Sequence, residues 1–567
     1  MKMNKIFYIL FFLPVVFITS CNEDEPSVPQ RSILSFTFPA FDPTVEGQID
    51  QQTKTITVEF PYGTDLTNLA PQIEVSPGST VAPPSGEKQD FSDPVLYVVT
   101  DQDGFDKVYT VLSELGASNE NEIISFRFPN IYVDAVVDGS NVTARVPYGT
   151  DVTSLMPDIK ISAGATITPN DGVEQNFSSP VTYTITAANE ETRDFTVEVI
   201  EDDQQTAIRG VWLTDVSSVL TSRENIIAAV EKVAELNMNT IFMVTWNQAM
   251  TTYPSDIMEN LTGTRIDPRY GSRDPLQEMI EEAHARGIKV MAWFEYGFAV
   301  NYTSPNKSLS LSEQIQQSGG PVLQAKPDWA GVDVNGDLLE KNNFIWMNGL
   351  HPEVQKFMTS LMLEVVQNYE IDGVQGDDRL PAMPSEGGYD DYTINSYQQA
   401  FGTAPPTGTK NSAWLRWRAD ILNDYAAHLY DTVKYTDSDV VVAMSPSPLD
   451  FGFVEYLQDW PNWVNNGHAD IVSPQLYRRE NQGIDVYNSL LNYQLSKINQ
   501  EKISTFYPGL LISLASYYPS AEFFADMVQS NRAKGVSGEV YFYYLGLLRN
   551  EEVIKALYPA PAIYPTF

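Results

Sequence analysis

The chain has 567 residues, of which 43% are hydrophobic, 12% are aromatic and 19% are charged. This composition supplies apolar side chains for more than one hydrophobic core, and it excludes a disordered tail protein, a collagen-like repeat and a coiled coil. The 35 Lys and Arg residues stand against 74 Asp and Glu residues, which gives a net charge of −39 at pH 7. Because so acidic a surface repels phosphate backbones, we expect no nucleic-acid partner.

The N-terminal segment has the pattern of a secretory signal. Lys2 and Lys5 precede an apolar run at 6–18, and small residues and Cys21 follow it. The run is too short to span a bilayer comfortably. We therefore predict a signal peptide at residues 1–20.

Cys21 is the one cysteine of the sequence, so a disulfide within the chain and a Cys-based zinc site are excluded. A Cys that directly follows small residues resembles the lipobox of bacterial lipoproteins, which implies acylation of Cys21 and anchoring in the outer membrane. The acidic run at 22–25 is similar to the export tag of surface-exposed Bacteroidetes lipoproteins. Residues 21–30 are thus expected to be an acidic tether. The anchored protein is expected to face the cell surface, with the periplasmic face as the alternative.

A repeat occupies residues 31–201. The sequence Pro-Tyr-Gly-Thr-Asp at 61–65 recurs 86 residues later, at 147–151. Short runs such as 55–60 alternate apolar and polar residues between turn-forming clusters, which is typical of antiparallel strands. We predict two immunoglobulin-like β-sandwiches, at 31–115 and 120–201. They resemble modules that precede enzymes in Bacteroidetes lipoproteins, where a spacer role is expected and sugar binding is the alternative.

After a polar linker at 201–207 the pattern changes. Short apolar runs now alternate with amphipathic helical stretches such as 225–236, 275–286 and 352–369, which predicts a (β/α)8 barrel over residues 208–557. The predicted strands are 210–213, 240–244, 288–294, 371–374, 440–444, 469–472, 502–506 and 538–542. An open doubly wound sheet is the alternative, but no glycine-rich nucleotide-binding motif supports it.

Acidic residues follow two neighbouring strands of this predicted barrel. Glu295 comes after the third strand, and Asp377 and Asp378 come after the fourth. Reactive groups of such barrels gather at the C-terminal strand ends, and glycoside cleavage needs one carboxylic acid and a second carboxylate. We therefore predict Asp377, Asp378 and Glu295 as catalytic. The alternatives are an Asp pair that caps loop amides and a Glu295 that forms an ordinary salt bridge.

Aromatic, amide and guanidinium groups share the same predicted mouth, a composition suited to sugar rings and hydroxyls. The predicted substrate-binding residues are Trp246, Asn247, Arg379, Asp390, Gln475, Tyr477, Arg478 and Tyr544. Asp390 lies in a long loop after the fourth strand and is an alternative second carboxylate. Trp212 and Trp293 lie within strands and are predicted to be core residues. The four histidines are scattered, so we predict no cofactor and no histidine-based metal site, while a carboxylate-bound Ca²⁺ stays open.

The barrel segment resembles the glycosyl-hydrolase-like family 10. The motifs that carry the resemblance are Arg-Gly-Val-Trp-Leu-Thr at 209–214, Tyr-Pro-Ser at 253–255, Glu-Ala-His-Ala-Arg-Gly at 282–287, His-Pro-Glu-Val at 351–354, Asp-Gly-Val at 372–374, Gln-Asp-Trp-Pro-Asn-Trp at 458–463 and Pro-Gln-Leu-Tyr at 474–477. The resemblance implies a glycosidase, and bacterial members of the family include one that cuts peptidoglycan glycan strands. Many members have His-Phe before the Asp pair and Asn-Pro after the third strand, where this chain has Gln375-Gly376 and Glu295-Tyr296. The substrate and the acid/base assignment therefore stay open.

The sequence thus predicts a monomeric, lipid-anchored glycoside hydrolase of the cell envelope that acts on a polysaccharide. A glycan-binding lipoprotein without catalysis is the main alternative, and a structural adhesion protein is the third. The glycosidic linkage, the anomeric outcome and the exo or endo mode are not determined by these patterns, since the carboxyl separation decides the stereochemistry.

Overall fold

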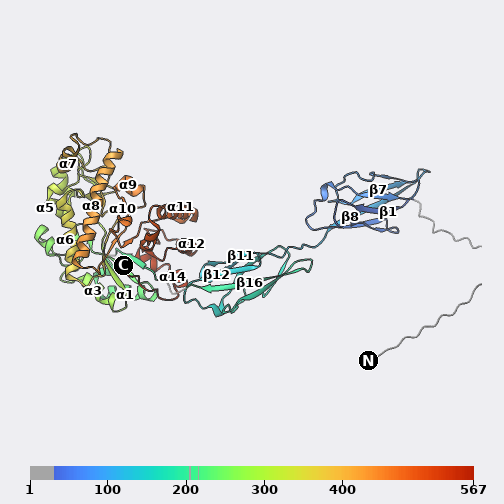
Figure 1. The fold of residues 1–567 in the computed structure, drawn as a ribbon, viewed down its shortest axis with the longest axis horizontal. Helices are drawn as coiled ribbons and strands as arrows, with labels where there is room; N and C mark the ends of the chain where they lie inside the picture. The colour runs from blue at the N-terminus through green and yellow to red at the C-terminus, as the bar shows by residue number, and fades with distance from the viewer. Residues whose placement is uncertain (1–30, 203–205, 215) are drawn as a thin grey trace, which may run out of the picture. The chain divides into compact units, whose positions relative to one another are not determined.

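The computed structural model describes residues 31–202, 206–214 and 216–567. The predicted signal peptide at 1–20, the tether at 21–30 and Cys21 lie outside the described residues. Figure 1 shows two β-modules, followed by a larger module in which helices surround parallel strands. Within the described ranges, no helix combines the length and the apolar character needed to cross a bilayer.

The first β-module is built from two sheets. One sheet has the order β2-β1-β5 and the other has the order β3-β4-β8-β7-β6. The strands are β1 (Ile33–Phe38), β2 (Val45–Glu46), β3 (Gln48–Asp50), β4 (Thr55–Phe60), β5 (Gln72–Val75), β6 (Thr80–Ala82), β7 (Val95–Thr100) and β8 (Asp106–Leu115). Alternate side chains point inward, and the rings of Phe36, Phe38 and Phe91 meet edge to face in the core.

The second β-module repeats this arrangement with the orders β10-β9-β13 and β11-β12-β16-β15-β14. Its strands are β9 (Ile123–Phe128), β10 (Val133–Asp134), β11 (Val136–Asp138), β12 (Asn141–Val146), β13 (Asp158–Ile161), β14 (Thr166–Thr168), β15 (Val181–Thr186) and β16 (Thr192–Glu201). The all-β prediction is confirmed, with one difference: β4 pairs with β8, and β12 with β16, in parallel. Several strands separate the members of each pair, so no hairpin forces them to run antiparallel.

The third module is a (β/α)8 barrel, as predicted. Its sheet has the order β27-β26-β25-β21-β18-β17-β29-β28 within the described part of the chain. The strands are β17 (Arg209–Leu213), β18 (Thr240–Val244), β21 (Lys289–Phe294), β25 (Gly373–Gly376), β26 (Val441–Met444), β27 (Ile471–Val472), β28 (Gly509–Leu511) and β29 (Glu539–Phe542). A parallel bridge from Gln475 to Gly509 joins the two ends of the sheet. The strands are buried on both faces, which explains their continuous apolar sequences.

The predicted seventh strand at 502–506 is wrong. Residues Gln500–Thr505 form a 3-10 helix, and the strand is β28, a few residues later. The β-branched and aromatic residues Ile503, Thr505 and Phe506 favour a strand by composition, which is why the segment imitates one. The true strand begins at Gly509, where a Cβ would lie 2.9 Å from the Trp212 ring, so packing inside the barrel determines its position.

Helices surround the strands and fill the connecting segments (Figure 1). The longer helices are α1 (Arg223–Glu235), α3 (Pro275–His284), α6 (Pro352–Asn368), α7 (Asp391–Phe401), α8 (Ser412–Thr436), α11 (Ile484–Leu495) and α12 (Ala521–Ala533). The shorter ones are α2 (Asp256–Thr262), α4 (Leu311–Ser318), α5 (Gly320–Ala325), α9 (Phe451–Tyr456), α10 (Trp460–Asn465), α13 (Tyr544–Leu547) and α14 (Glu551–Leu557). The predicted helices at 225–236, 275–286 and 352–369 correspond to α1, α3 and α6.

The long segment after β25 is ordered by Arg418 of α8. Its side chain is fully buried, and its guanidinium donates to the carbonyl oxygens of Ser385 at 2.8 Å, Gly387 at 2.6 Å and Thr409 at 2.7 Å. Buried carbonyl groups without a donor would cost free energy, so this one side chain satisfies loop backbone that no secondary structure pairs. The segment is thereby held at the end of the barrel where the candidate site lies.

Candidate active site

The barrel brings the three predicted catalytic carboxyl groups into one cluster. β21 and β25 are adjacent parallel strands, and Phe294 stands opposite Gly376 in their register. Glu295 and Asp377 follow these two residues directly, so they extend from neighbouring strand ends at the same edge. The fold therefore brings together two residues that are 82 positions apart in the sequence. We call Glu295, Asp377 and Asp378 the acidic cluster.

Arg379 holds the acidic cluster together. Its Nη2 lies 3.0 Å from Asp377 Oδ2, and its Nη1 lies 2.8 Å from Asp378 Oδ1. Its Nε and Nη2 also donate to the backbone oxygen of Glu295, at 3.0 and 2.7 Å. The side chain is 13% exposed, so these charge-assisted contacts are shielded from water. Arg379 is thus a positioning residue for the carboxylates, and its direct contact with substrate stays a prediction.

Asp377 is the buried member of the Asp pair. Its side chain is 3% exposed, against 27% for Asp378. Its Oδ1 accepts a hydrogen bond of 2.8 Å from Gln475 Nε2. Burial, followed by the charge of Asp378, raises the pKa of Asp377 well above its usual range, although Arg379 opposes the shift. The two neighbours therefore have different surroundings, as expected for adjacent residues at a strand end.

Glu295 lies between two side-chain donors. Thr214 Oγ1 donates to its Oε1 at 2.9 Å, and Asn247 Nδ2 donates to its Oε2 at 2.7 Å. Burial raises the pKa of Glu295, while Arg379 and the two hydrogen bonds lower it in part. Thr214 follows β17 and was not among the predicted site residues. The polar residue at the end of the first strand was the signal that could have identified it.

Tyr477 contributes a hydroxyl group that faces the acidic cluster. Burial raises its pKa well above its usual range, and the charges of Asp377 and Asp378 raise it further. The hydroxyl has no hydrogen-bond partner among the described residues, although the ring packs on Phe542 with centroids 5.2 Å apart. A buried donor without a partner is uncommon, and contact of Tyr477 with substrate stays a prediction.

Two predicted substrate-binding residues have other roles. Trp246 is fully buried, its Nε1 donates to Gly297 O at 3.0 Å, and its ring packs on Phe357, which contradicts contact with a sugar. The short β19 (Trp246–Asn247) and β20 (Met250–Thr251) hairpin directs this ring into the core. Asp390 caps α7 by accepting from Thr393 N at 3.0 Å, as its spacing to Thr393 could have indicated. Asp390 is therefore a helix cap, and its role as the second carboxylate stays a prediction.

The remaining predicted contacts lie near strand ends. Asn247 and Gln475 bind Glu295 and Asp377, as described above. Arg478 is partly buried, and its Nη1 donates to Tyr477 O at 2.7 Å. Tyr544 is 6% exposed and begins α13. Contact of Arg478 and Tyr544 with substrate stays a prediction.

Gly376 and Gln375 explain the departure from the family pattern before the Asp pair. A Cβ at Gly376 would lie 2.3 Å from the carbonyl oxygen of Leu380, so this backbone leaves no room for Phe. Gln375 is fully buried, and its Oε1 accepts from Trp212 Nε1 at 2.7 Å.

Trp212 and Trp293 are each 1% exposed, as expected for core residues. The described residues contain no group of three His, Cys, Asp or Glu side chains that could hold a metal ion.

Aromatic rings of the segment after β21 were missed by the sequence analysis. This segment forms a small sheet of β22 (Ala299–Tyr302), β23 (Glu340–Lys341) and β24 (Phe344–Trp346). The Arg379 guanidinium carbon lies 4.6 Å from the Phe344 ring and 5.6 Å from the Tyr296 ring. The segment between the third predicted strand and the predicted helix at 352–369 is unusually long. This length was the signal in the sequence that could have pointed to these rings.

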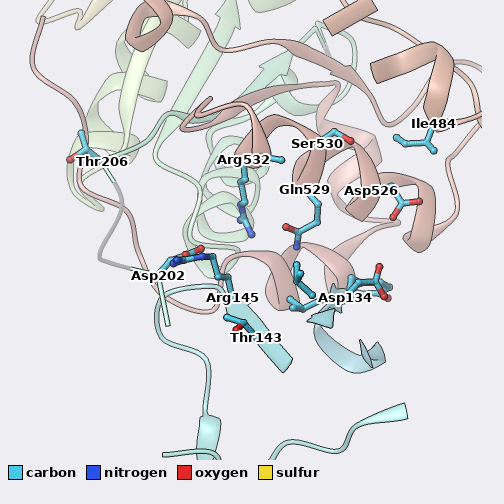
Figure 2. A pocket seen from close by; sticks show the side chains of 14 residues that line it. Asp134, Thr143, Arg145, Asp202, Thr206, Ile484, Asp526, Gln529, Ser530 and Arg532 are labelled. Atoms are coloured by element: carbon cyan, nitrogen blue, oxygen red, sulfur yellow. The ribbon is translucent and has the colours of Figure 1, made fainter. Parts of the chain in front are cut away.

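A separate pocket of about 950 Å³ contains none of the predicted site residues. Figure 2 shows Asp134, Arg145, Asp526 and Arg532 among the side chains that line it. It contributes nothing to the acidic cluster.

Comparisons with known proteins agree with the barrel assignment. The family model "Glycosyl hydrolase-like 10" matches residues 207–518, and the model "SGBP, N-terminal" matches residues 33–112 and 123–199. The glycosyl hydrolase DigH of Escherichia coli K12 is 30% identical over 306 residues, which cover 48% of this chain and 65% of DigH. The glycosyl hydrolase YngK of Bacillus subtilis 168 is 25% identical over 411 residues, which cover 63% of this chain and 73% of YngK.

Among solved structures, the chain is similar to the glycoside hydrolase domain of PgaB (BpsB) from Bordetella bronchiseptica. The identity is 12% and the TM-score is 0.45, with 63% of this chain and 99% of that chain covered. The chain spans 65% of the length of the DigH relatives that it matches.

The raised pKa of Glu295 predicts a stabilising substitution. A carboxyl group with a higher pKa in the folded than in the unfolded state loses stability as the pH rises above the unfolded value. Glu295→Gln removes this loss, and its amide can still accept from Asn247 and donate to Thr214. We expect the variant to be more stable than the parent by roughly 0.5–2 kcal/mol at pH 8. The gain should shrink toward pH 4, where the carboxyl group is protonated in both states.

Denaturant unfolding at both pH values measures this difference. The exposed Glu370→Gln is the matched control, with an expected change within about 0.5 kcal/mol. Equal stability of the parent and Glu295→Gln at pH 8 would contradict the account of Glu295.

Proposed function

Because this chain belongs to the glycosyl hydrolase-like 10 family, we propose that its barrel hydrolyses glycosidic bonds of a polysaccharide at the acidic cluster. The observation that carries the proposal is the joining of Glu295, Asp377 and Asp378 by Arg379 at two adjacent strand ends. Hydrolysis of this kind requires two carboxyl groups in different protonation states. The two Asp side chains differ in burial, because Asp377 is 3% exposed and Asp378 is 27% exposed.

We assign the general acid to Glu295. Its raised pKa favours the protonated form, from which the proton passes to the glycosidic oxygen as the bond from that oxygen to the anomeric carbon breaks. Asp378 is the second carboxylate, since its side chain is 27% exposed and its Oδ1 is paired with Arg379. It acts on the anomeric carbon either directly or through a water molecule. Asp377 is a positioning residue, since its side chain is 3% exposed and is bound by Arg379 and Gln475.

Denuded peptidoglycan glycan strands are the first substrate to test, because the sequence resemblance implies them. A glycan-binding protein without catalysis is the alternative that the same experiment addresses. In that case Asp378→Asn would leave glycan binding intact, and the parent protein would show no hydrolysis.

Removal of either proposed catalytic carboxyl group tests the assignment. We expect Glu295→Gln and Asp378→Asn each to lower the rate of reducing-end release by about 10²–10⁴-fold, the usual contribution of such groups. Asp391→Asn is the matched control, because Asp391 is the exposed member of a second Asp-Asp pair and should retain full activity. The assay compares peptidoglycan strands with plant and host polysaccharides. A well-folded parent protein that releases no reducing ends from any of them would refute the proposal.

The pH dependence of activity tests the role of Glu295. Thr214→Val removes a hydrogen bond that favours the charged form of Glu295, so the pKa of Glu295 should rise. A general acid works while it is protonated, and the alkaline limb of the kcat/KM profile should therefore move to higher pH. An unchanged or acid-shifted limb would remove Glu295 from the acid role.

We also propose that the protein is a monomer anchored in the outer membrane through acylated Cys21. The support for the anchor is the sequence of residues 1–25 alone. Metabolic labelling with a palmitate analogue should mark the parent protein and not Cys21→Ser, and the variant should leave the membrane fraction. Protease accessibility on intact cells then decides between the cell surface and the periplasm.

A further inference from the structure

The small sheet after β21 arranges three side chains in one row. Tyr302 of β22 stands opposite Phe344 of β24, and Phe344 stands opposite Lys341 of β23. Residues directly opposite each other in antiparallel strands share a face of the sheet. The row therefore runs Lys341, Phe344, Tyr302 across one face, and we call Phe344 and Tyr302 the aromatic row.

The aromatic row continues from the acidic cluster toward solvent. Arg379, which binds both Asp377 and Asp378, has its guanidinium carbon 4.6 Å from the Phe344 ring centroid. The Phe344 and Tyr302 centroids are 5.0 Å apart at an interplanar angle of 69°. Phe344 is partly buried and Tyr302 is 54% exposed. The contacts thus run from the acidic cluster through Arg379 and Phe344 to the exposed ring of Tyr302.

The row is held in place at its other end by Lys341. Lys341 Nζ lies 2.9 Å from Glu386 Oε2 and 2.8 Å from Glu455 Oε2, and its side chain is 15% exposed. Glu386 belongs to the segment after β25, and Glu455 belongs to α9 after β26. This ion-pair network joins the segments that follow three successive strands, and it holds β23, which pairs with the strand of Phe344.

Packing of the protein core does not require the outer ring of this row. Tyr296 is 7% exposed and already covers the inner side of Phe344, with centroids 5.4 Å apart. Tyr302 adds a second ring that is more than half open to solvent. A single exposed aromatic residue needs no explanation, but one that continues a chain of contacts from a charged cluster indicates a binding surface.

We propose that the aromatic row is a carbohydrate subsite beside the acidic cluster. It takes a pyranose ring of an extended glycan, whose apolar C–H face stacks on Tyr302 while another unit occupies the cluster. The electron-rich face of an aromatic ring attracts such weakly positive C–H groups. This inference rests on the proposed function and deepens it. A subsite beside the acidic cluster favours glycan chains over disaccharides as substrates.

Binding by a catalytically blocked protein tests the subsite. In an Asp378→Asn background, calorimetry with chitohexaose, cellohexaose and amidase-treated peptidoglycan strands measures affinity, and chitobiose and cellobiose serve as short probes. Tyr302→Ala should weaken binding of at least one long probe about three- to tenfold, the size expected for one ring contact. Tyr302→Phe keeps the ring and should stay within about twofold, because stacking uses the ring face. Disaccharide binding should not change.

The matched control is Tyr435→Ala. Tyr435 is 93% exposed near the C-terminal end of α8, from which the chain enters β26 at the opposite end of the barrel. It should leave every affinity unchanged. The subsite is overturned if Tyr302→Ala binds all long probes as tightly as the background, or if the background binds none of them.

The two proposals can fail separately. If the parent protein cleaves no glycan but binding depends on Tyr302, the subsite stands and the glycosidase assignment falls. If cleavage is found and Tyr302→Ala binds normally, only the subsite falls.

Discussion

A single guanidinium group makes the acidic cluster possible. Glu295, Asp377 and Asp378 lie at adjacent strand ends, where burial alone would disfavour three negative charges and where those charges would also repel one another. Arg379 places its donors on both Asp carboxylates and on the backbone of Glu295. The positive charge offsets part of the repulsion, and the fork geometry fixes the direction of each group. The structure of the site depends on this one side chain.

The cluster is not arranged for maximal stability. Burial raises the pKa values of Glu295 and Asp377, so these groups would fold more favourably as neutral residues at physiological pH. Thr214, Asn247 and Gln475 each direct one donor at these two carboxyl groups. Such donors select an orientation and a protonation state, which an apolar neighbour could not do. Catalytic groups typically lower the stability of the fold in exchange for such a fixed orientation.

Buried cations in the long connecting segments give the open end of the barrel a fixed shape. Arg418 satisfies three loop carbonyl groups, and Lys341 joins Glu386 to Glu455. Arg418 replaces secondary structure that its segment lacks, and Lys341 links side chains of separate segments. The aromatic row is positioned by the second of these networks. The surface available to a substrate therefore depends on ion pairs that lie outside the acidic cluster.

The sequence by itself determined the two β-modules, the barrel and the three carboxyl groups, because repeats and the alternation of strands with helices are local patterns. It placed Glu295 and the Asp pair at strand ends, and the topology of a parallel barrel brings neighbouring strand ends together. Only the tertiary structure decided that β28 begins at Gly509, that Trp246 points into the core and that Tyr302 lies next to Phe344. The direction of a side chain and the pairing of distant segments are set by what packs against them, and those neighbours are far away in the chain.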